Sequence, residues 1–591
     1  MRRKLVGILH AQGTSSMLTA RRYRIRRPQG PGHSPSVTAI SVAFFCLMLA
    51  ACSSRPTQPD TRLVLAFTVD QLRGDVLPRY RSRFGADPSS GFGYLQRHGV
   101  IFSDANFDHA TTFTAVGHAT LFTGAQASSH GITGNAWFEG NRQVWSVDDP
   151  ESPVLNGNPN ATETGSPRNL MIETVGDALI DELGGAARVF SVSTKERSAI
   201  LPGGRHGKAF WYDRQTGDYV TSRYYYEKTP TWLVQWNELG RVEELRNKQW
   251  NLLDDRAAYI YADADDAPWE PDTEYLGNTF PHTLDRGKDT DFFSVLRATP
   301  MADDLTLDVA RRLIEAERIG QRSGIDMLAI GLSATDYVGH VFGPSSLEAE
   351  DNVFRLDRAL GKFLDFIDER VGLEHTVIVL SADHGVPEIP ERYIAMGSDS
   401  GRIDIPDLMR RIRTALSEKF DTDRNLLTGF SNPAIFLDHS AIGELQIDPA
   451  AVEAAVAEIA SDEPGVAVAI TRTQISANKM PDPALAAKIR NGYYASRSGD
   501  VILVQKPNWY LHPRPDAYAT MHGSPYRYDT HIPLIFVVPG VTAREIGRPV
   551  RAVDMAPTLA SILGLGSLEH ASGQILTEAV PALPGFAATQ H

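Results

Sequence analysis

Short apolar runs alternate with amphipathic segments along most of the chain. The runs are hydrophobic at successive positions, a pattern typical of strands buried on both faces of a parallel sheet. They lie at 62–69, 188–193, 326–332, 376–380 and 532–538. Between 346 and 368, apolar residues recur every three or four positions, which predicts a long helix. The alternation predicts an α/β fold with a mostly parallel central sheet flanked by helices.

Further helix-forming segments complete this pattern, and two stretches break it. The additional helices are expected at 91–98, 115–122, 172–183, 305–316 and 555–563. Residues 210–300 are aromatic and charged without clear periodicity, whereas residues 395–505 contain helices and strands of their own. We interpret both stretches as insertions that form cap subdomains on one catalytic domain spanning about 62–565, followed by a tail at 566–591. The first insertion is expected to lie over the functional site.

The N-terminus has the features of an export signal. Basic residues at 21–27 precede an apolar run at 38–51, which is too short to span a bilayer comfortably. The run ends at Leu49-Ala50-Ala51-Cys52, which resembles a bacterial lipobox. The resemblance implies a signal peptide over 1–52, lipidation of Cys52 and a flexible tether over 53–61. An uncleaved membrane anchor is the alternative, and Met17 is an alternative start.

From this signal we expect an extracytoplasmic protein of a Gram-negative bacterium, anchored by lipid at the periplasmic face of the outer membrane, with the inner membrane as the alternative. The composition of the chain excludes one class of partner and two kinds of cysteine-based site. The net charge of −14 excludes a general nucleic-acid binder, because such proteins carry basic patches. The two cysteines, Cys46 and Cys52, both lie near the N-terminus, so the rest of the chain has no disulfide framework and no cysteine metal site. The oligomeric state is left open.

Acidic and imidazole side chains follow the predicted strands. Asp70 comes directly after the run at 62–69, and Asp383-His384 come shortly after the run at 376–380. Asp336 and His340 follow the run at 326–332 and are four residues apart, which places both on one face of a helix. Open α/β sheets bind ligands outside the carboxyl ends of their strands, so these side chains are expected to converge there. Asp and His are good zinc ligands, although they leave manganese and iron open.

A set of spaced motifs resembles the alkaline phosphatase superfamily. It is most similar to the PafA-type phosphomonoesterases, which are close to the type I phosphodiesterases and nucleotide pyrophosphatases. The motifs are Val69-Asp70-Gln71, Thr114 with Gly117-His118, Thr123-Gly124, 130–135 (HGITGN), 336–340 (DYVGH), 381–385 (SADHG) and His522-Gly523. The resemblance covers about 62–565 and implies an alkaline-phosphatase-like fold.

The resemblance also implies two zinc ions per chain and a nucleophile. Two ligand sets are implied: Asp336, His340 and His522 for one zinc, and Asp70, Asp383 and His384 for the other. Thr114 would touch the second zinc and form a covalent phosphothreonine intermediate that water hydrolyses. Metal coordination is one of the few ways to activate a threonine hydroxyl, and two metals can clamp the attacking and leaving oxygens. Thr111 and Thr112 are rivals for this role.

Lys195 and Arg197 bear on the substrate class. Two residues apart, they would face the same way if the chain stays extended, although a solvated charged loop is the alternative. The resemblance implies that both, together with Asn135, contact the phosphoryl oxygens and act in catalysis. A monoester has one more non-bridging oxygen than a diester, so these donors favour small phosphate monoesters and an alkaline phosphatase activity.

Three other functions compete with this one. A phosphodiesterase or nucleotide pyrophosphatase of the same superfamily is the runner-up. A sulfatase is disfavoured because Thr114 stands where that class, by the resemblance, has a modified cysteine or serine. A non-catalytic surface lipoprotein would be expected to lack a metal ligand, and none is missing from the motifs.

Overall fold

The protein is described by a computed structural model of residues 61–581, apart from 156–162, 271–275, 286–288 and 515–516. The predicted signal peptide, Cys52 and the tether up to residue 60 lie outside the described residues. Among the helices of the described part, none has both the length and the apolar character that crossing a membrane requires.

A ten-stranded sheet forms the centre of the fold, in the order β19-β2-β18-β11-β1-β10-β5-β6-β7, with β20 paired to β2. Five neighbouring strands run parallel. They are β11 (Thr376–Ser381), β1 (Leu63–Val69), β10 (Ile325–Leu332), β5 (Ala187–Ser193) and β6 (Lys208–Tyr212). All residues of β1 are buried, as expected for a strand covered on both faces. The predicted α/β fold with a mostly parallel central sheet is therefore confirmed.

The outer strands differ from the sequence prediction. β18 (His531–Val537) runs antiparallel to β11 and to β2 (Val100–Asn106), and β2 was not predicted at all. Only three of the seven residues of β2 are buried, so it lacks the continuous apolar run that marks the central strands. β6 and β7 (Tyr219–Val220) continue the central sheet, although most of this segment was expected to belong to the first insertion.

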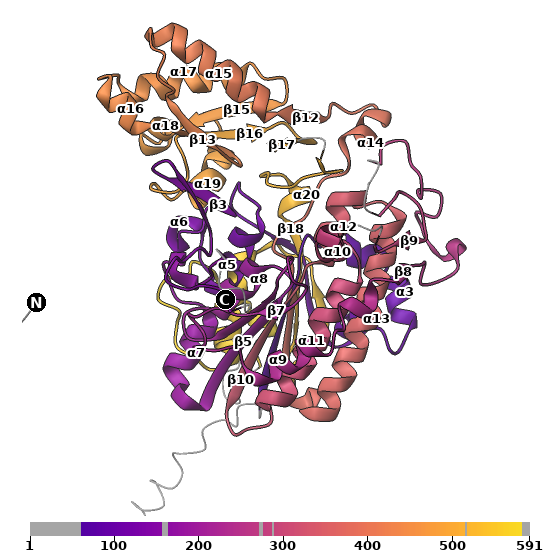
Figure 1. Cartoon of the computed structure of the whole chain (residues 1–591). Coiled ribbons are helices and arrows are strands. Elements are labelled where there is room, and N and C mark those ends of the chain that lie inside the picture. The colour runs from indigo at the N-terminus through magenta and orange to yellow at the C-terminus, as the bar shows by residue number, and fades with distance from the viewer. Residues whose placement is uncertain (1–60, 156–162, 271–275, 286–288, 515–516, 582–591) are drawn as a thin grey trace, which may run out of the picture. The chain divides into compact units, whose positions relative to one another are not determined.

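Helices cover both faces of the sheet. Figure 1 shows α11 and α13 along one face and α5, α7 and α8 along the other. These helices are α11 (Met301–Glu317), α13 (Leu347–Arg370), α5 (Thr114–Thr123), α7 (Val175–Leu183) and α8 (Glu196–Gly203). Helix α7 begins three residues later than predicted because Thr174 caps it. The Thr174 hydroxyl accepts from the Asp177 amide, and the Asp177 carboxylate accepts from the Thr174 amide.

A second sheet belongs to the segment expected as the later insertion. Its four strands follow the order β13-β14-β16-β15 and are antiparallel. They are β13 (Leu427–Ser431), β14 (Ala434–Leu437), β15 (Val466–Thr471) and β16 (Val501–Gln505). Helices α15 (Ile405–Phe420) and α17 (Pro449–Ser461) pack with this sheet around a hydrophobic core of their own. We call this unit the cap.

The cap meets the central domain at a β-hairpin of β3 (Ala136–Glu139) and β4 (Arg142–Trp145). The Ser431 hydroxyl of β13 donates to the Ala136 carbonyl oxygen over 2.7 Å. Phe138 packs against Phe436 of β14, with ring centroids 5.3 Å apart. The hairpin thus connects the cap to the region that follows α5.

Close helix packing supplies a test of the fold. A Cβ atom added at Gly361 in α13 would lie 1.9 Å from the Ser89 carbonyl oxygen, whereas one added at Gly85 in α3 (Arg81–Ala86) would meet nothing within 4 Å. We expect Gly361→Ala to lower the free energy of unfolding by about 1–3 kcal/mol through overpacking. The control Gly85→Ala should raise it by up to about 1 kcal/mol through helix propensity. Urea unfolding measures both, and equal stabilities would contradict this packing.

Candidate metal centre and active site

The predicted ligands from the three central strands converge at one edge of the sheet. Asp70 directly follows β1, and the Asp383-His384 pair lies just beyond β11. Asp336 and His340 lie on α12 (Ala334–Phe342), which begins two residues after β10. Because β11, β1 and β10 are adjacent and parallel, their carboxyl ends bring these side chains into one buried crevice.

Asp70, Asp383 and His384 form one compact set, which we call the Asp383 group. One ligand atom from each lies within 4.8 Å of the others. The His384 Nε2 atom is 3.5 Å from the Asp70 Oδ1 and 3.5 Å from the Asp383 Oδ2. The Thr114 hydroxyl lies 3.4 Å from the same Nε2 atom, so the predicted nucleophile stands beside this group.

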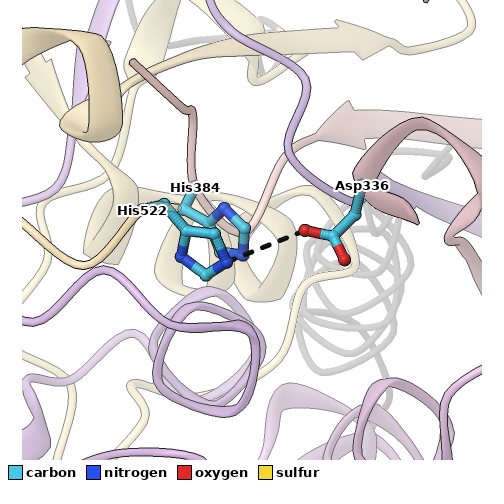
Figure 2. Close-up of side chains that lie close together, drawn as sticks. All are labelled: Asp336, His384 and His522. Carbon is cyan, nitrogen blue, oxygen red and sulfur yellow. Dashed lines mark ion pairs between the residues drawn. The ribbon is translucent and has the colours of Figure 1, made fainter. Parts of the chain in front are cut away.

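A second set, the Asp336 group, consists of Asp336, His384 and His522, again with ligand atoms within 4.8 Å of one another. The resemblance implies His340 in place of His384. The His340 Nε2 atom is 3.1 Å from the Asp336 Oδ1, so His340 does reach this carboxylate. The His384 and His522 rings are stacked, with centroids 3.6 Å apart and planes at 18° (Figure 2). This stacking brings His384 within reach of both groups.

The three histidines are held in one tautomer by backbone carbonyls. Each Nδ1 atom lies within hydrogen-bonding distance of a carbonyl oxygen, at 2.8 Å for His340 and Thr520, 3.0 Å for His384 and Gly385, and 2.7 Å for His522 and Thr112. A carbonyl oxygen only accepts, so each Nδ1 donates and leaves the Nε2 lone pair free for the crevice. Burial lowers the pKa of His384 and of His522 below the ordinary value, which favours the neutral form that binds metals.

Three carboxylates share the crevice with one buried cation. The Lys195 Nζ atom lies 2.7 Å from the Asp70 Oδ2 and 2.5 Å from the Asp336 Oδ2. Burial raises the pKa of Asp70 well above its ordinary value, and the neighbouring carboxylates of Asp336 and Asp383 add to the rise. Burial opposes ionisation of Asp336 too, but His340 and Lys195 outweigh it and hold the pKa well below its ordinary value.

These residues fit a divalent cation. The Asp70 Oδ1 and the Asp383 Oδ2 are buried and accept no hydrogen bond from any described residue. Buried polar atoms without a partner are costly, and a cation would satisfy both. Mixed carboxylate and imidazole donors, with the histidines oriented from behind by carbonyls, are typical of zinc sites.

The residues expected to contact the phosphoryl group line one cavity. Thr114 is the first residue of α5, and the Asn135 Oδ1 accepts from the next backbone amide, that of Ala115, over 3.0 Å. The expectation of an extended chain at Lys195 and Arg197 is wrong, because α8 begins at Glu196 directly after Lys195. Both side chains still reach the cavity. The Arg197 Nη1 atom donates to Glu196 over 3.0 Å, while its buried Nε atom has no partner among the described residues.

A cavity of about 320 Å³ opens above these groups. Thr114, Lys195 and Asp336 lie at its polar end. The rest of its wall includes residues of the β3–β4 hairpin, the cap, α12 and the segment before His522, among them Trp145, Phe430, Asn432, Tyr337, His512 and Tyr518. The side chain of Trp145 is half exposed. The cavity thus combines a charged end with an aromatic wall, which suits a small ester with an organic leaving group.

Two residues that the sequence marked only as members of motifs have structural roles at the site. The Gln71 side-chain amide contacts Asp336 and its backbone amide contacts Asp383. Gly117 permits α5 to approach Asp383, because a Cβ there would lie 2.0 Å from the Asp383 carbonyl oxygen. The rival Thr112 instead donates its hydroxyl to the carbonyl of Ser524 over 3.0 Å.

Comparisons with known proteins agree with this geometry. The model of the type I phosphodiesterase / nucleotide pyrophosphatase family matches residues 64–525. The chain is 33% identical to alkaline phosphatase PafA of Elizabethkingia meningoseptica, covering 88% of this chain and 95% of that protein. It is 31% identical to alkaline phosphatase PhoV of Synechococcus elongatus, over 91% and 100% of the two chains. The crystal structure of wild-type alkaline phosphatase PafA superposes with a TM-score of 0.80 at 31% identity, covering 88% and 99% of the two chains.

The crowding of carboxylates predicts that a metal stabilises the fold. We expect zinc at a hundredfold excess over its dissociation constant to raise the free energy of unfolding of chelator-treated protein by about 2.7 kcal/mol. Thermal unfolding with and without zinc measures the rise. The rise caused by zinc should be smaller in Asp383→Asn. It should persist in the control Asp357→Asn, because Asp357 is a buried carboxylate that accepts hydrogen bonds from Ser90 and Phe92 outside both groups. An unchanged unfolding midpoint for the wild type would show that the crevice does not take up the ion.

Proposed function

The chain belongs to the type I phosphodiesterase / nucleotide pyrophosphatase family, and on that premise we propose that it is a metal-dependent alkaline phosphatase that hydrolyses phosphate monoesters. Relatives named alkaline phosphatases match most of its length. The observation that carries the proposal is a cavity lined by Thr114, Lys195, Arg197 and the ligands Asp336, His340 and His522. The Asp383 group lies directly behind it, with the His384 Nε2 atom 3.4 Å from the Thr114 hydroxyl.

Two sets of three ligands are proposed to hold two zinc ions, with His340 in place of His384 in the Asp336 group. Asp70, Asp383 and His384 would hold one, and Asp336, His340 and His522 the other. When bound, the two ions neutralise charge on the phosphoryl oxygens and favour deprotonation of the threonine hydroxyl. The chain's own part is to supply buried Nε2 and carboxylate donors whose orientation is set by backbone carbonyls.

Thr114 is proposed as the nucleophile. Its position at the first turn of α5 would set the phosphoryl group against the positive end of the helix dipole. The Thr114 oxygen attacks phosphorus, the bond from phosphorus to the leaving-group oxygen breaks, and that oxygen takes a proton from solvent. Water then attacks the phosphothreonine, which releases inorganic phosphate and restores the hydroxyl.

Lys195, Arg197 and Asn135 are proposed to bind the non-bridging oxygens. The nearby carboxylates of Asp336 and Asp70 outweigh burial and raise the pKa of Lys195, so the ammonium stays charged at alkaline pH. The Arg197 side chain lines the cavity, and its buried Nε atom has no partner among the described residues. A monoester dianion has three non-bridging oxygens for these donors, which is the basis for preferring monoesters to diesters.

The runner-up is a phosphodiesterase or nucleotide pyrophosphatase, which the matching family model favours by its description. A non-catalytic lipoprotein has less support, because every predicted ligand is present and buried. The proposed location is the periplasmic face of the outer membrane. The lipobox-like segment Leu49-Ala50-Ala51-Cys52 supports a lipid anchor there. Small phosphorylated molecules, rather than nucleic acid, remain the proposed substrates.

Substrate preference is tested at Arg197. We expect Arg197→Ala to lower kcat/KM for an aryl phosphate monoester by about 10²–10³-fold, since it removes a donor to the transition-state charge. Hydrolysis of the matching diester should change less than tenfold. Parallel assays of Lys195→Ala, with zinc content measured, show whether the loss of the lysine acts through the metal ligands Asp70 and Asp336 that it contacts. Equal losses on both esters in Arg197→Ala would favour the diesterase.

The nucleophile is tested at Thr114. Thr114→Ala should lose about 10³-fold or more in kcat while still binding zinc, and Thr114→Ser should retain substantial activity because it keeps a hydroxyl. The control Thr112→Ala should fold and hydrolyse the monoester within about tenfold of wild type. Acid-quenched wild type incubated with labelled substrate should carry phosphate on Thr114. A fully active Thr114→Ala variant would overturn the assignment.

A further inference from the structure

We propose that Gln71 is a positioning residue that couples the two metal groups. It does so by hydrogen-bonding to Asp383 of one group and Asp336 of the other, which fixes the orientation of the two carboxylates. The inference rests on the proposed metal-dependent function and assigns to it a residue outside both ligand sets. Gln71 is buried and follows Asp70 directly in the chain. It therefore lies between the ligands without being one of them.

Two hydrogen bonds from Gln71 reach carboxylates of different groups. Its backbone N–H donates to the Asp383 Oδ1 over 3.1 Å. Its side-chain Nε2 donates to the Asp336 Oδ1 over 2.8 Å. An ionised carboxylate accepts only, so the amide nitrogen must face Asp336. One residue thus links the Asp383 group to the Asp336 group.

The backbone of Gln71 is in a conformation that its side chain disfavours. Its φ is +67°, in the left-handed region where glycine is the usual residue. This conformation aims the N–H at Asp383 while the side chain extends toward α12. A strained non-glycine residue persists when the contacts around it hold it in that conformation, and such residues cluster at functional sites. The strain at Gln71 therefore points to a use for its amide, which a glycine could not supply.

Helix α12 is shaped to receive this amide. A Cβ atom at Gly339 would lie 1.9 Å from the Gln71 Oε1, so the Gln71 amide occupies the space that a larger residue at this point of the helix would fill. The other oxygen of Asp336, its Oδ2, is held by Lys195 at 2.5 Å. Gln71 and Lys195 thus each bind one of the two oxygens of the Asp336 carboxylate and together set its rotation. A neutral amide does this without adding charge beside Asp70.

Loss of the hydrogen bond from Gln71 to Asp336 should weaken metal binding without unfolding the protein. In Gln71→Gly the backbone N–H to Asp383 remains, the left-handed strain is relieved, and only the amide to Asp336 is lost. Residues that orient metal ligands typically contribute 10–100-fold to metal affinity. We expect Gln71→Gly to weaken one of the two zinc sites by about 10–100-fold and to leave the other near its wild-type affinity.

The experiment is a chelator-competition titration of zinc on the full chain, with thermal unfolding of the metal-free proteins alongside. Gln446→Gly is the matched control, since Gln446 is also a glutamine at positive φ (+55°) but lies exposed beyond α16 (His439–Glu444). We expect the control to keep both wild-type affinities. Gln71→Gly should unfold at or above the wild-type midpoint when metal-free, and excess zinc should restore its monoesterase activity.

Three results would count against different parts of this account. Wild type with two zinc ions and Gln71→Gly with the same two affinities would overturn the positioning role while leaving the proposed function intact. Wild type that binds no zinc would overturn the proposed function itself. A shift in unfolding midpoint alone, with zinc affinities unchanged, would show that Gln71 acts only in folding.

Discussion

Electrostatic repulsion among three buried carboxylates is the constraint on which the site depends. Asp70, Asp336 and Asp383 are drawn together because the strands before them are adjacent and parallel. Within the described chain, Lys195 is the one lysine or arginine in ion-pair contact with any of them. Like charges at such range strongly disfavour ionisation unless cations offset them. The fold therefore carries a local electrostatic cost that bound metal ions would relieve, which is the physical link between this sheet and metal-dependent chemistry.

The surroundings of the crevice hold it against that repulsion. Backbone carbonyls set each histidine tautomer, Gln71 bonds to carboxylates of both groups, and Gly117 and Gly339 let α5 and α12 approach closely. Further out, the cap and the β3–β4 hairpin leave room for an organic group next to the charged end of the cavity. The strands and helices of the central domain thus position the ligand side chains, while the cap and the hairpin form part of the cavity wall.

The central part of the fold could be predicted because burial on both faces leaves a plain signal. β1, β10 and β11 are continuous apolar runs, and α13 has a clear helical period, so the acidic residues after the strands could be expected to meet. β2 escaped prediction because it lies toward the edge of the sheet and is only half buried. β6 and β7 lie in an aromatic segment where no period distinguishes sheet from insertion.

Within the site, residue types and spacing identified the converging set, but local geometry did not follow from them. Nothing in the sequence around Lys195 showed that a helix begins at the next residue. The stacking of His384 on His522 joins residues far apart in the chain and depends on tertiary packing alone. Gln71 was visible as a member of the motif Val69-Asp70-Gln71, but its contacts were not, because a left-handed backbone at a glutamine has no pattern in a single sequence.

The most direct measurement is anomalous X-ray diffraction from crystals grown with zinc, recorded above and below the zinc absorption edge. The account predicts two anomalous peaks, one among Asp70, Asp383, His384 and the Thr114 hydroxyl, and one beside Asp336 and His522. It also predicts that Lys195 gives up at least one of its two carboxylate contacts. A single peak elsewhere, or no peak while Lys195 still pairs with Asp70 and Asp336, would contradict it.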